Sequence, residues 1–318
     1  MSQETWLLGL MLVVFLGLVT VLKWPVGLSL AATSMAVAVA DGHGIPLRHL
    51  VEGMFGYLDV CLVLITAMIF MKVIEKNGLL DVLTCDLMLR FGRSPATMLT
   101  VMTLIIMFPG MITGSCTASV LSTGVLLVPV LLKMNMPKST AGAIVAMAAV
   151  YGMIAPPVNI VVMIIGGGID MPYIGFDLPL LYMTLPLAIL TTLYLGYGYA
   201  RRADMTAVMA EFSCRERAPG GFLLYLPLLV LIVLMIGPKA LPALFPDPRL
   251  PLTFVICTAL ALLSGRKFNL LDAAQTGVAE ILSVVGILMG VGMLIQIMTL
   301  TGIRGQIAVT SLSLPSYL

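Results

Sequence analysis

The chain alternates between long apolar runs and short polar connections. Runs close to the ~20 residues that a helix needs to span a bilayer occupy residues 6–22, 25–40, 54–74, 178–199, 222–237 and 281–300. A shorter run at 253–264 reaches spanning length only if residues 250–251 begin it. This hydropathy pattern predicts an all-α polytopic membrane protein.

The region between residues 96 and 168 is also apolar but is interrupted twice. The first interruption is the polar cluster in "MITGSCTASVLSTGVLLVPVLLK", and the second is "GMIAPPVN". Non-helical backbone is tolerated in a membrane only where protein or water satisfies its freed groups. We therefore expect a re-entrant helical hairpin at 96–134 and a broken transmembrane helix at 139–168. Two ordinary crossings at 96–112 and 117–134 fit the charge pattern equally well, so the hairpin is inferred from its polar tip.

The second interruption frees backbone groups that suit ions. Pro156 and Pro157 remove two amide donors and push Ala155 out of helical geometry, and Gly152 lets a neighbouring backbone approach closely. Freed carbonyls suit a hard cation such as sodium, whereas the start of the next half-helix, near Asn159, suits an anion. A simple proline kink is the alternative interpretation of this motif.

The first interruption supplies hydroxyl groups. Thr113, Ser115, Thr117 and Ser119 carry them, and Gly114 allows the backbone to turn. The alternative is that small residues permit close helix packing and the hydroxyls bond back to their own helix. Because both interruptions fall within one predicted membrane layer, we favour a binding site.

The two ends of the chain show a weak internal repeat. At an offset of 224 residues, Gly78 falls on Gly302 and Ile74 on Met298. In run order, the runs that start at 6, 25 and 54 likewise correspond to those that start at 222, 251 and 281, with opposite expected directions across the membrane. An inverted repeat of this kind is common in secondary transporters. A second polar tip would fall near residues 337–341, so we expect the native chain to continue beyond Leu318.

This repeat divides the chain into four expected parts. They are first-repeat scaffold helices with an interfacial arm (1–93), a first transport unit (94–177), an exit helix with a cytoplasmic linker (178–221), and second-repeat scaffold helices without a second hairpin (222–318).

Composition and charge support the membrane assignment. The chain is 60% hydrophobic and 10% charged, with a mean hydropathy of +1.11, whereas soluble domains carry about 25% charged residues. The net charge of +2 does not suggest nucleic acid. With a periplasmic N-terminus, 13 of the 17 Lys and Arg residues lie on the cytoplasmic side. The five cysteines are far apart, so we expect no transition-metal site.

Three segments together resemble the large permease subunit of tripartite ATP-independent periplasmic (TRAP) transporters. They are "MITGSCTASVLSTGVLLVPVLLKM", "AGAIVAMAAVYGMIAPPVNIVVMIIGG" and "YIGFDLPLLYMTLPLAILTTLYLGYGYARR". The family shows a Gly-Ser hairpin tip, a basic end of the second hairpin arm, a Gly-x-x-x-Pro-Pro break and an exit helix that ends in Arg. Here these features are Gly114 with Ser115, Lys133, Gly152 to Pro157, and Arg201 with Arg202.

The resemblance implies an inverted-repeat transporter of the bacterial inner membrane, with a scaffold and a mobile transport domain. It further implies sodium as coupling ion, no organic cofactor, and import of a small organic anion of the dicarboxylate or sugar-acid class. A periplasmic substrate-binding protein and a small membrane subunit would be its partners. The sodium-binding positions that the resemblance implies would be Gly114, Ser115, Thr117, Gly152 and Ala155. The tip hydroxyl of Thr113 adds a sixth position. The substrate-binding positions would be Ser115, Cys116, Thr117 and Asn159.

Two other functions compete with this one. A sodium and anion symporter of similar hairpin architecture would need no binding protein. An intramembrane hydrolase could use Ser115 or Cys116 as nucleophile, but no Asp or Glu lies between Arg90 and Asp170 to act as base. Since both histidines also fall outside the predicted membrane layer, we expect that the protein is not an enzyme.

Overall fold

The computed structural model describes residues 3–92, 94–169, 171, 173, 175–204, 208, 221–240 and 248–313. It divides into two compact units. The first unit comprises Met1–Leu62, Ile164–Pro172 and Ile281–Leu318, and the second comprises Val63–Met163 and Tyr173–Glu280. Within the described residues the secondary structure is helical, without strands, as expected for an all-α protein.

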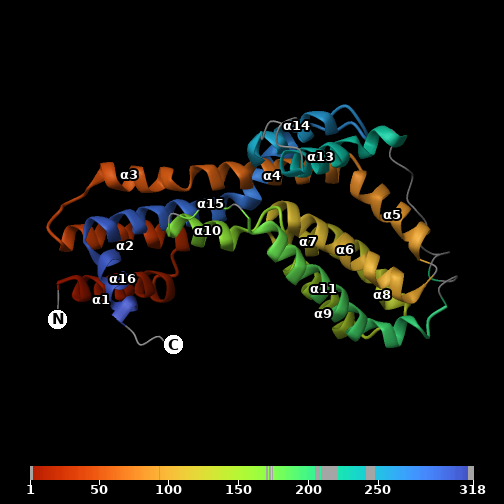
Figure 1. Ribbon diagram of the computed structural model, residues 1–318, viewed down its shortest axis with the longest axis horizontal. Helices are drawn as coiled ribbons and strands as arrows, with labels where there is room; N and C mark the ends of the chain where they lie inside the picture. Colours follow the sequence, from red (N-terminus) through yellow and green to blue (C-terminus); the bar gives the residue numbers. More distant parts are fainter. Residues whose placement is uncertain are drawn as a thin grey trace. The chain divides into compact units, whose positions relative to one another are not determined.

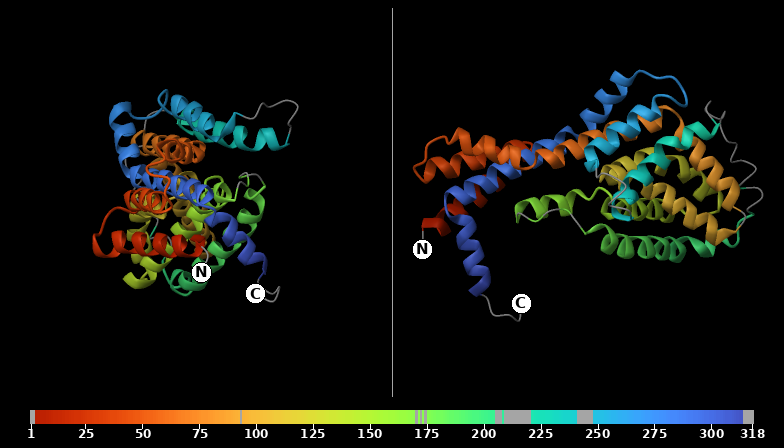
Figure 2. Two further views of the ribbon diagram at one scale, coloured as in Figure 1. Left: turned by 90° about the vertical axis from the view of Figure 1, so that its left-hand side faces the viewer. Right: turned by 45° about the horizontal axis from the view of Figure 1, so that its top comes forward.

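Two helices, α4 and α15, begin in one unit and end in the other, and so does the short helix α10 (Figure 1). The first unit otherwise contains α1 (Gln3–Leu16), a π-helical turn (Gly17–Val21), α2 (Val26–Ala40), α3 (Leu47–Gly56) and α16 (Ile303–Ser313). The shared helices are α4 (Leu58–Lys76), α10 (Ile160–Gly168) and α15 (Leu270–Leu300). Figure 2 shows α16 turning away from the end of α15, where Gly302 adopts a φ of 76°.

The second unit contains the interrupted region and its surroundings. Its helices are α5 (Leu79–Phe91), α6 (Pro95–Thr113), α7 (Cys116–Ser119), a π-helical turn (Val120–Gly124), α8 (Val125–Lys133), α9 (Lys138–Ile154), α11 (Asp177–Ala200), a 3-10 turn (Gly221–Tyr225), α13 (Leu226–Ala240) and α14 (Arg249–Ala261).

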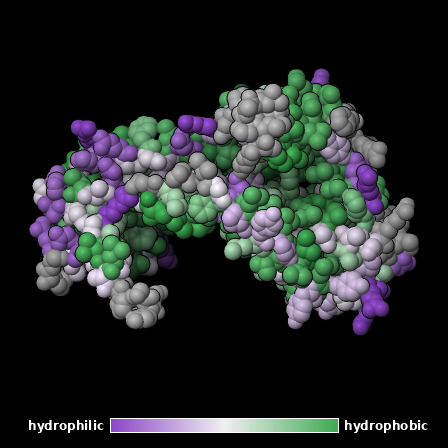
Figure 3. Space-filling view, in the orientation of Figure 1, coloured by the Kyte–Doolittle hydropathy of each residue, from purple (hydrophilic) through white to green (hydrophobic). Residues whose placement is uncertain are grey.

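Several helices are long and apolar enough to cross a membrane. Among the described residues these are Gln3–Val21, Pro95–Thr113, Cys116–Lys133, Asp177–Ala200 and Leu270–Leu300. A sixth candidate is the pair α3 and α4, which is bent by 48°. Hydrophobic residues cover large parts of the visible surface of each unit, as expected for lipid contact (Figure 3). The prediction of a polytopic membrane protein is confirmed. Each hairpin arm has spanning length, so re-entrance of the hairpin stays a prediction.

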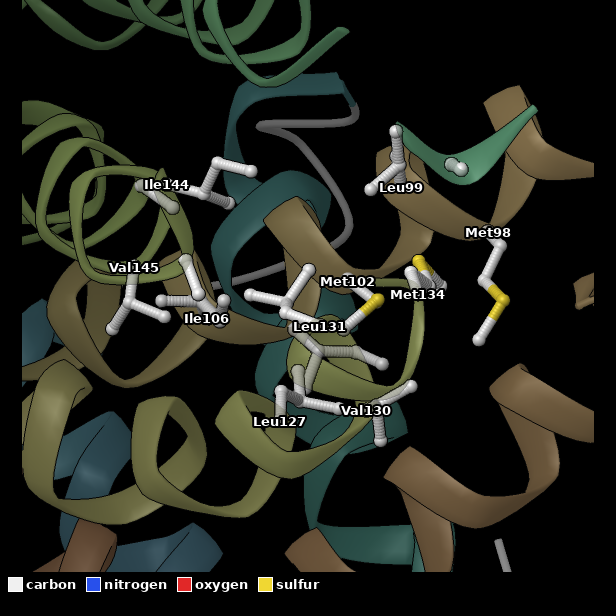
Figure 4. Packing of buried hydrophobic residues seen from close by; sticks show 14 of the residues in the cluster. Met98, Leu99, Met102, Ile106, Leu127, Val130, Leu131, Met134, Ile144 and Val145 are labelled. Carbon is white, nitrogen blue, oxygen red and sulfur yellow. The ribbon is translucent and has the colours of Figure 1, made fainter. Parts of the chain in front are cut away.

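A methionine-rich hydrophobic core holds the interrupted region together. Met102 and Ile106 of α6 pack with Leu131 of α8 and Ile144 of α9 in one buried cluster (Figure 4). Helix α11 joins this cluster at Gly196, where an added Cβ would lie 3.1 Å from Ile144 Cδ1. Methionine suits such irregular interfaces because its side chain is unbranched and flexible. The core fixes the hairpin, α6 to α8, against the broken helix, α9.

The repeat in the sequence is present in the helix boundaries. The offset of 224 carries residues 47–76, which form α3 and α4, onto residues 271–300 of α15. It also carries the first residue of α5, Leu79, onto the first residue of α16, Ile303. The preceding glycines, Gly78 and Gly302, both have left-handed φ values, 86° and 76°. The correspondence between the runs is therefore structural as well as compositional.

Candidate functional site

The hairpin tip is a glycine turn shaped by a threonine. Helix α6 ends at Thr113, and Gly114 follows with φ 65°, a left-handed conformation that favours glycine. The Thr113 hydroxyl donates to the Pro109 carbonyl at 2.8 Å and accepts from the Ser115 amide at 3.2 Å. The side chain of Thr113 is therefore engaged in holding the turn.

The return arm starts with a capped helical turn. The Ser115 hydroxyl caps α7 by accepting from the Ala118 amide at 3.3 Å. Ser115 and Cys116 are half-buried, and Thr117 is exposed. The next turn, Val120–Gly124, is π-helical, a distortion that is frequent at functional sites.

The second interruption breaks the helix at the two prolines, as predicted. Helix α9 ends at Ile154, and Ala155 is extended with ψ 148°, the conformation favoured before proline. Continued helix would pair the carbonyls of Gly152 and Met153 with the amides of residues 156 and 157. Because both of those residues are prolines without an N–H group, the two carbonyls have no intrahelical donor.

Asn159 joins the two half-helices. Its side-chain amide donates to the Ile154 carbonyl at 2.8 Å, and its side-chain oxygen accepts from the Val162 amide at 3.1 Å. The residue is 2% exposed. Asn159 thus fixes the first turn of α10, which leaves the other amides of that turn as donors for an anion.

The two interruptions touch each other. The Val158 amide donates to the Met111 carbonyl at 3.2 Å, which links the break to the hairpin. A Cβ added to Gly152 would lie 2.5 Å from the Met107 carbonyl oxygen, and one added to Gly114 would lie 2.7 Å from Ile160 Cγ1. Glycine is therefore required sterically at both positions.

The predicted site residues differ in how far they are accessible. Thr113, Gly114, Gly152, Ala155 and Asn159 are buried, whereas Ser115, Cys116 and Thr117 retain exposure. The structure therefore brings the tip and the break together as one wall, with Ser115, Cys116 and Thr117 as its accessible part.

Ser119 belongs to this wall but was absent from the predicted sodium and substrate positions. Its side chain is fully buried, and its hydroxyl has no hydrogen-bond partner among the described residues. The hydroxyl oxygen lies 2.7 Å from the position of a Cβ on Gly110, and the Gly152 carbonyl carbon lies 3.0 Å from that same position. Ser119 follows Ser115 by four residues, so helical spacing puts both on one face. That spacing is the sequence signal that would have found it.

Tyr173 also approaches the site, from the segment after α10. Its hydroxyl is buried near the backbone of Asn159, and its ring stacks on Phe176 with a centroid distance of 6.0 Å. Burial, together with the charge of Asp177, raises the pKa of the Tyr173 hydroxyl. No periodicity or motif in the sequence indicated this residue.

Charged side chains are lacking in the hairpin tip and the break, residues 109–124 and 152–160. A cation at this wall would be held by carbonyl and hydroxyl oxygens, which are the ligands that hard cations prefer. An anion would meet backbone amides and hydroxyls. The arrangement therefore suits joint binding of opposite charges more than proton-transfer chemistry.

The sequence comparison agrees with this arrangement. A family model for the DctM component of tripartite ATP-independent periplasmic transporters matches residues 11–317. The chain belongs to this family. A DctM component is the large permease subunit of a TRAP transporter, so the resemblance seen in the two interruptions is confirmed. The family implies association with a small membrane subunit and a substrate-binding protein. No curated protein matches the chain at a significant level.

Proposed function

We propose that this DctM component imports small organic anions of the dicarboxylate or sugar-acid class by sodium symport. In this proposal it lies in the bacterial inner membrane with a periplasmic N-terminus and works by alternating access. A periplasmic binding protein delivers the anion, and the small membrane subunit completes the complex.

The observation that carries sodium coupling is the pair of carbonyls at Gly152 and Met153, which lack an intrahelical donor and lie next to the buried hydroxyl of Ser119. A buried polar atom without a partner costs about 1–3 kcal/mol. Such oxygens could hold a sodium ion although the tip and the break contain no carboxylate. We therefore assign the sodium site to the hairpin tip and the break, at Thr113, Gly114, Ser115, Thr117, Gly152 and Ala155, and add Ser119.

Anion binding is assigned to the accessible turn beside that site. Ser115 caps α7, Cys116 and Thr117 begin it, and Asn159 fixes the amides of α10. Sodium and an anion bound side by side neutralise each other, so closing the site over both is favoured over closing it on either alone.

Uptake into proteoliposomes tests the proposal. The chain is reconstituted with the small subunit and the binding protein, and radiolabelled succinate and sialic acid are offered. Accumulation should require an inward sodium gradient and stop when potassium replaces sodium. Uptake that persists without sodium would overturn the coupling. Uptake by the chain without any binding protein would favour the symporter alternative.

Ser119→Ala sharpens the sodium assignment. Losing a cation ligand should raise the half-saturating sodium concentration several-fold, whereas removing an unsatisfied buried hydroxyl should leave the melting temperature equal or higher. Ser122→Ala is the matched control, because that hydroxyl donates to the Ala118 carbonyl at 2.6 Å. Equal sodium dependence in the two variants would remove Ser119 from the site.

A further inference from the structure

Tyr173 carries a buried hydroxyl that lacks a partner. It belongs to the second unit, together with the hairpin tip, the break and residues 160–163 of α10. The hydroxyl oxygen is shielded from solvent and has no hydrogen-bond partner among the described residues. A buried polar group left unpaired costs about 1–3 kcal/mol, which phenylalanine at the same place would avoid. The hydroxyl therefore points to a ligand that pairs with it.

The ring of Tyr173 is held by stacking within the second unit. It lies nearly parallel to the ring of Phe176, with an interplanar angle of 11° and a centroid distance of 6.0 Å. Phe176 directly precedes α11, and the hydroxyls of Tyr151 in α9 and Thr191 in α11 lie 3.3 Å apart. The direction of the Tyr173 hydroxyl is thus set by helices that pack around the break.

The Tyr173 hydroxyl faces the backbone of Asn159. Burial and the charge of Asp177 raise the pKa of this hydroxyl, whereas the Asn159 backbone lowers it, which is the effect of an N–H donor. The Asn159 carbonyl is already engaged, because it accepts from the Met163 amide at 3.0 Å. The Asn159 amide is therefore the group that faces the tyrosine oxygen. An N–H directed at that oxygen polarises the O–H bond and makes the hydroxyl a stronger donor.

These donors lie at the start of α10, which packs on the hairpin tip. A Cβ added to Gly114 would lie 2.7 Å from Ile160 Cγ1 and 3.2 Å from the Val158 carbonyl oxygen. The positive end of the α10 dipole favours an anion there. Asp177 opposes this attraction only in part, because it is the first residue of α11 and the dipole of that helix offsets its charge. The hydroxyl of Tyr173 therefore lies where the proposed function puts the anion.

We infer that Tyr173 is a specificity residue of this transporter: its hydroxyl donates to the carboxylate of the substrate at the start of α10, next to the Asn159 amide. The inference rests on the proposed function and adds one side chain to its anion site. A neutral donor of this kind recognises a carboxylate by hydrogen-bond geometry rather than by charge. Substrate affinity should therefore depend on this hydroxyl, whereas sodium affinity should not.

Tyr173→Phe removes only the hydroxyl and keeps the ring that stacks on Phe176. The matched control is Tyr182→Phe in α11, because Tyr182 is 75% exposed. In the proteoliposome assay with succinate and sialic acid, Tyr173→Phe should raise the half-saturating substrate concentration about threefold to tenfold, the loss expected for one hydrogen bond. The half-saturating sodium concentration at saturating substrate should stay at the wild-type value. The melting temperature should be equal or higher, because the variant loses an unpaired buried hydroxyl.

Asp177→Asn tests the charge beside the hydroxyl. Removing a negative charge near a bound anion should lower the half-saturating substrate concentration, the direction opposite to that of Tyr173→Phe. A rise as large as that of Tyr173→Phe would show that the segment, and not the hydroxyl, sets substrate affinity, which would overturn the inference.

A readout without transport uses the native thiol of Cys116, which is free and half-buried at the tip. Bound substrate should slow the alkylation of this thiol by a maleimide, as measured by mass spectrometry on the purified complex. Tyr173→Phe should need about threefold to tenfold more succinate or sialic acid than wild type for half-maximal protection. Tyr182→Phe should match wild type.

The outcomes separate the two proposals. If the wild-type complex accumulates substrate without sodium, the sodium coupling of the proposed function fails, and the role of Tyr173 is still decided by substrate affinity and by protection of Cys116. If uptake requires sodium but Tyr173→Phe matches Tyr182→Phe in both measurements, the role of Tyr173 is overturned while the proposed function stands. A Tyr173→Phe variant that melts earlier and shifts the substrate and sodium concentrations equally would show a purely structural role, which also overturns the inference.

Discussion

The two copies of the repeat differ most at one pair of positions. In the first copy, α3 and α4 meet at Tyr57 with a bend of 48°. In the second copy, the same stretch is the single 31-residue helix α15. The offset of 224 aligns Gly56 with Glu280 and Tyr57 with Ile281.

This difference shows that similar apolar runs can form a bent helix pair in one copy and a continuous helix in the other. Glycine is about 1 kcal/mol less favourable in a helix than the best residues, and glutamate is close to the best. Gly56 therefore permits the bend that lets Tyr57 reach α10, whereas Glu280 continues the helix. Glu280 instead accepts from Lys72 at 2.7 Å. In the first copy the bend thus places Tyr57 against Ile164 and Gly167 of α10, and in the second copy the unbroken helix carries Glu280 to Lys72.

The two copies of the repeat also differ in how tightly their helices cross, with one crossing inside each unit. In the first unit, a Cβ on Gly53 would lie 2.4 Å from the Gly292 carbonyl oxygen, and one on Gly292 would lie 2.1 Å from the Gly53 carbonyl oxygen. The repeat equivalents of these residues, Gly277 and Met68, meet in the second unit. There a Cβ on Gly277 would lie 3.1 Å from the Met68 carbonyl oxygen. The first crossing is therefore the tighter one.

Gly292→Ala should have the largest effect on stability. The methyl group would collide with backbone rather than with a flexible side chain, so the helices must separate. Overpacking of this kind costs about 1–3 kcal/mol. The thermal melting temperature of the solubilised protein should fall clearly.

The control for this variant is Gly286→Ala, six residues earlier on the same helix, where a Cβ would have no neighbour within 4 Å. A melting temperature for Gly286→Ala that falls as far as that of Gly292→Ala would show that the loss comes from the helix and not from the crossing.

Hydropathy could predict the apolar part of each long helix but not its polar start. The run at 281–300 was visible, whereas α15 begins at Leu270. Residues 270–280 carry Asp272 and Glu280, which are ion-paired to Lys76 and Lys72 of α4. A single-sequence pattern does not reveal such partners, because they lie about 200 residues away in the chain.

The candidate site was predictable where a residue type dictates backbone shape. Gly114, Pro156 and Pro157 mark the two interruptions because glycine permits a left-handed φ, whereas proline fixes φ and removes a donor. The roles of the hydroxyls were not predictable. Thr113 holds the turn, and the buried hydroxyl of Ser119 has no hydrogen-bond partner among the described residues, yet both are small hydroxyl residues of the same polar cluster. Only packing distinguishes them.

Breaking the ion pair of Lys72 and Glu280 should have an intermediate effect. Lys72 also lies 3.2 Å from Glu75, and its side chain is 16% exposed. Partly exposed pairs of this kind contribute about 1 kcal/mol. A double-mutant cycle of Lys72→Gln and Glu280→Gln, followed by thermal melting, should give coupling of that size. Glu75→Gln in place of Glu280→Gln should couple less strongly, and purely additive effects of Lys72→Gln and Glu280→Gln would contradict the pairing.

Gly277→Ala should have the smallest effect, although Gly277 is the repeat equivalent of Gly53. The contact of 3.1 Å requires its neighbour to yield by only a few tenths of an ångström. Against that strain stands the gain of about 0.5–1 kcal/mol from alanine in a helix. The melting temperature should therefore stay close to wild type, while Gly53→Ala should lower it because its collision is with the Gly292 backbone. Equal losses in the two variants would show that both crossings are equally tight and would remove the packing difference between the repeats.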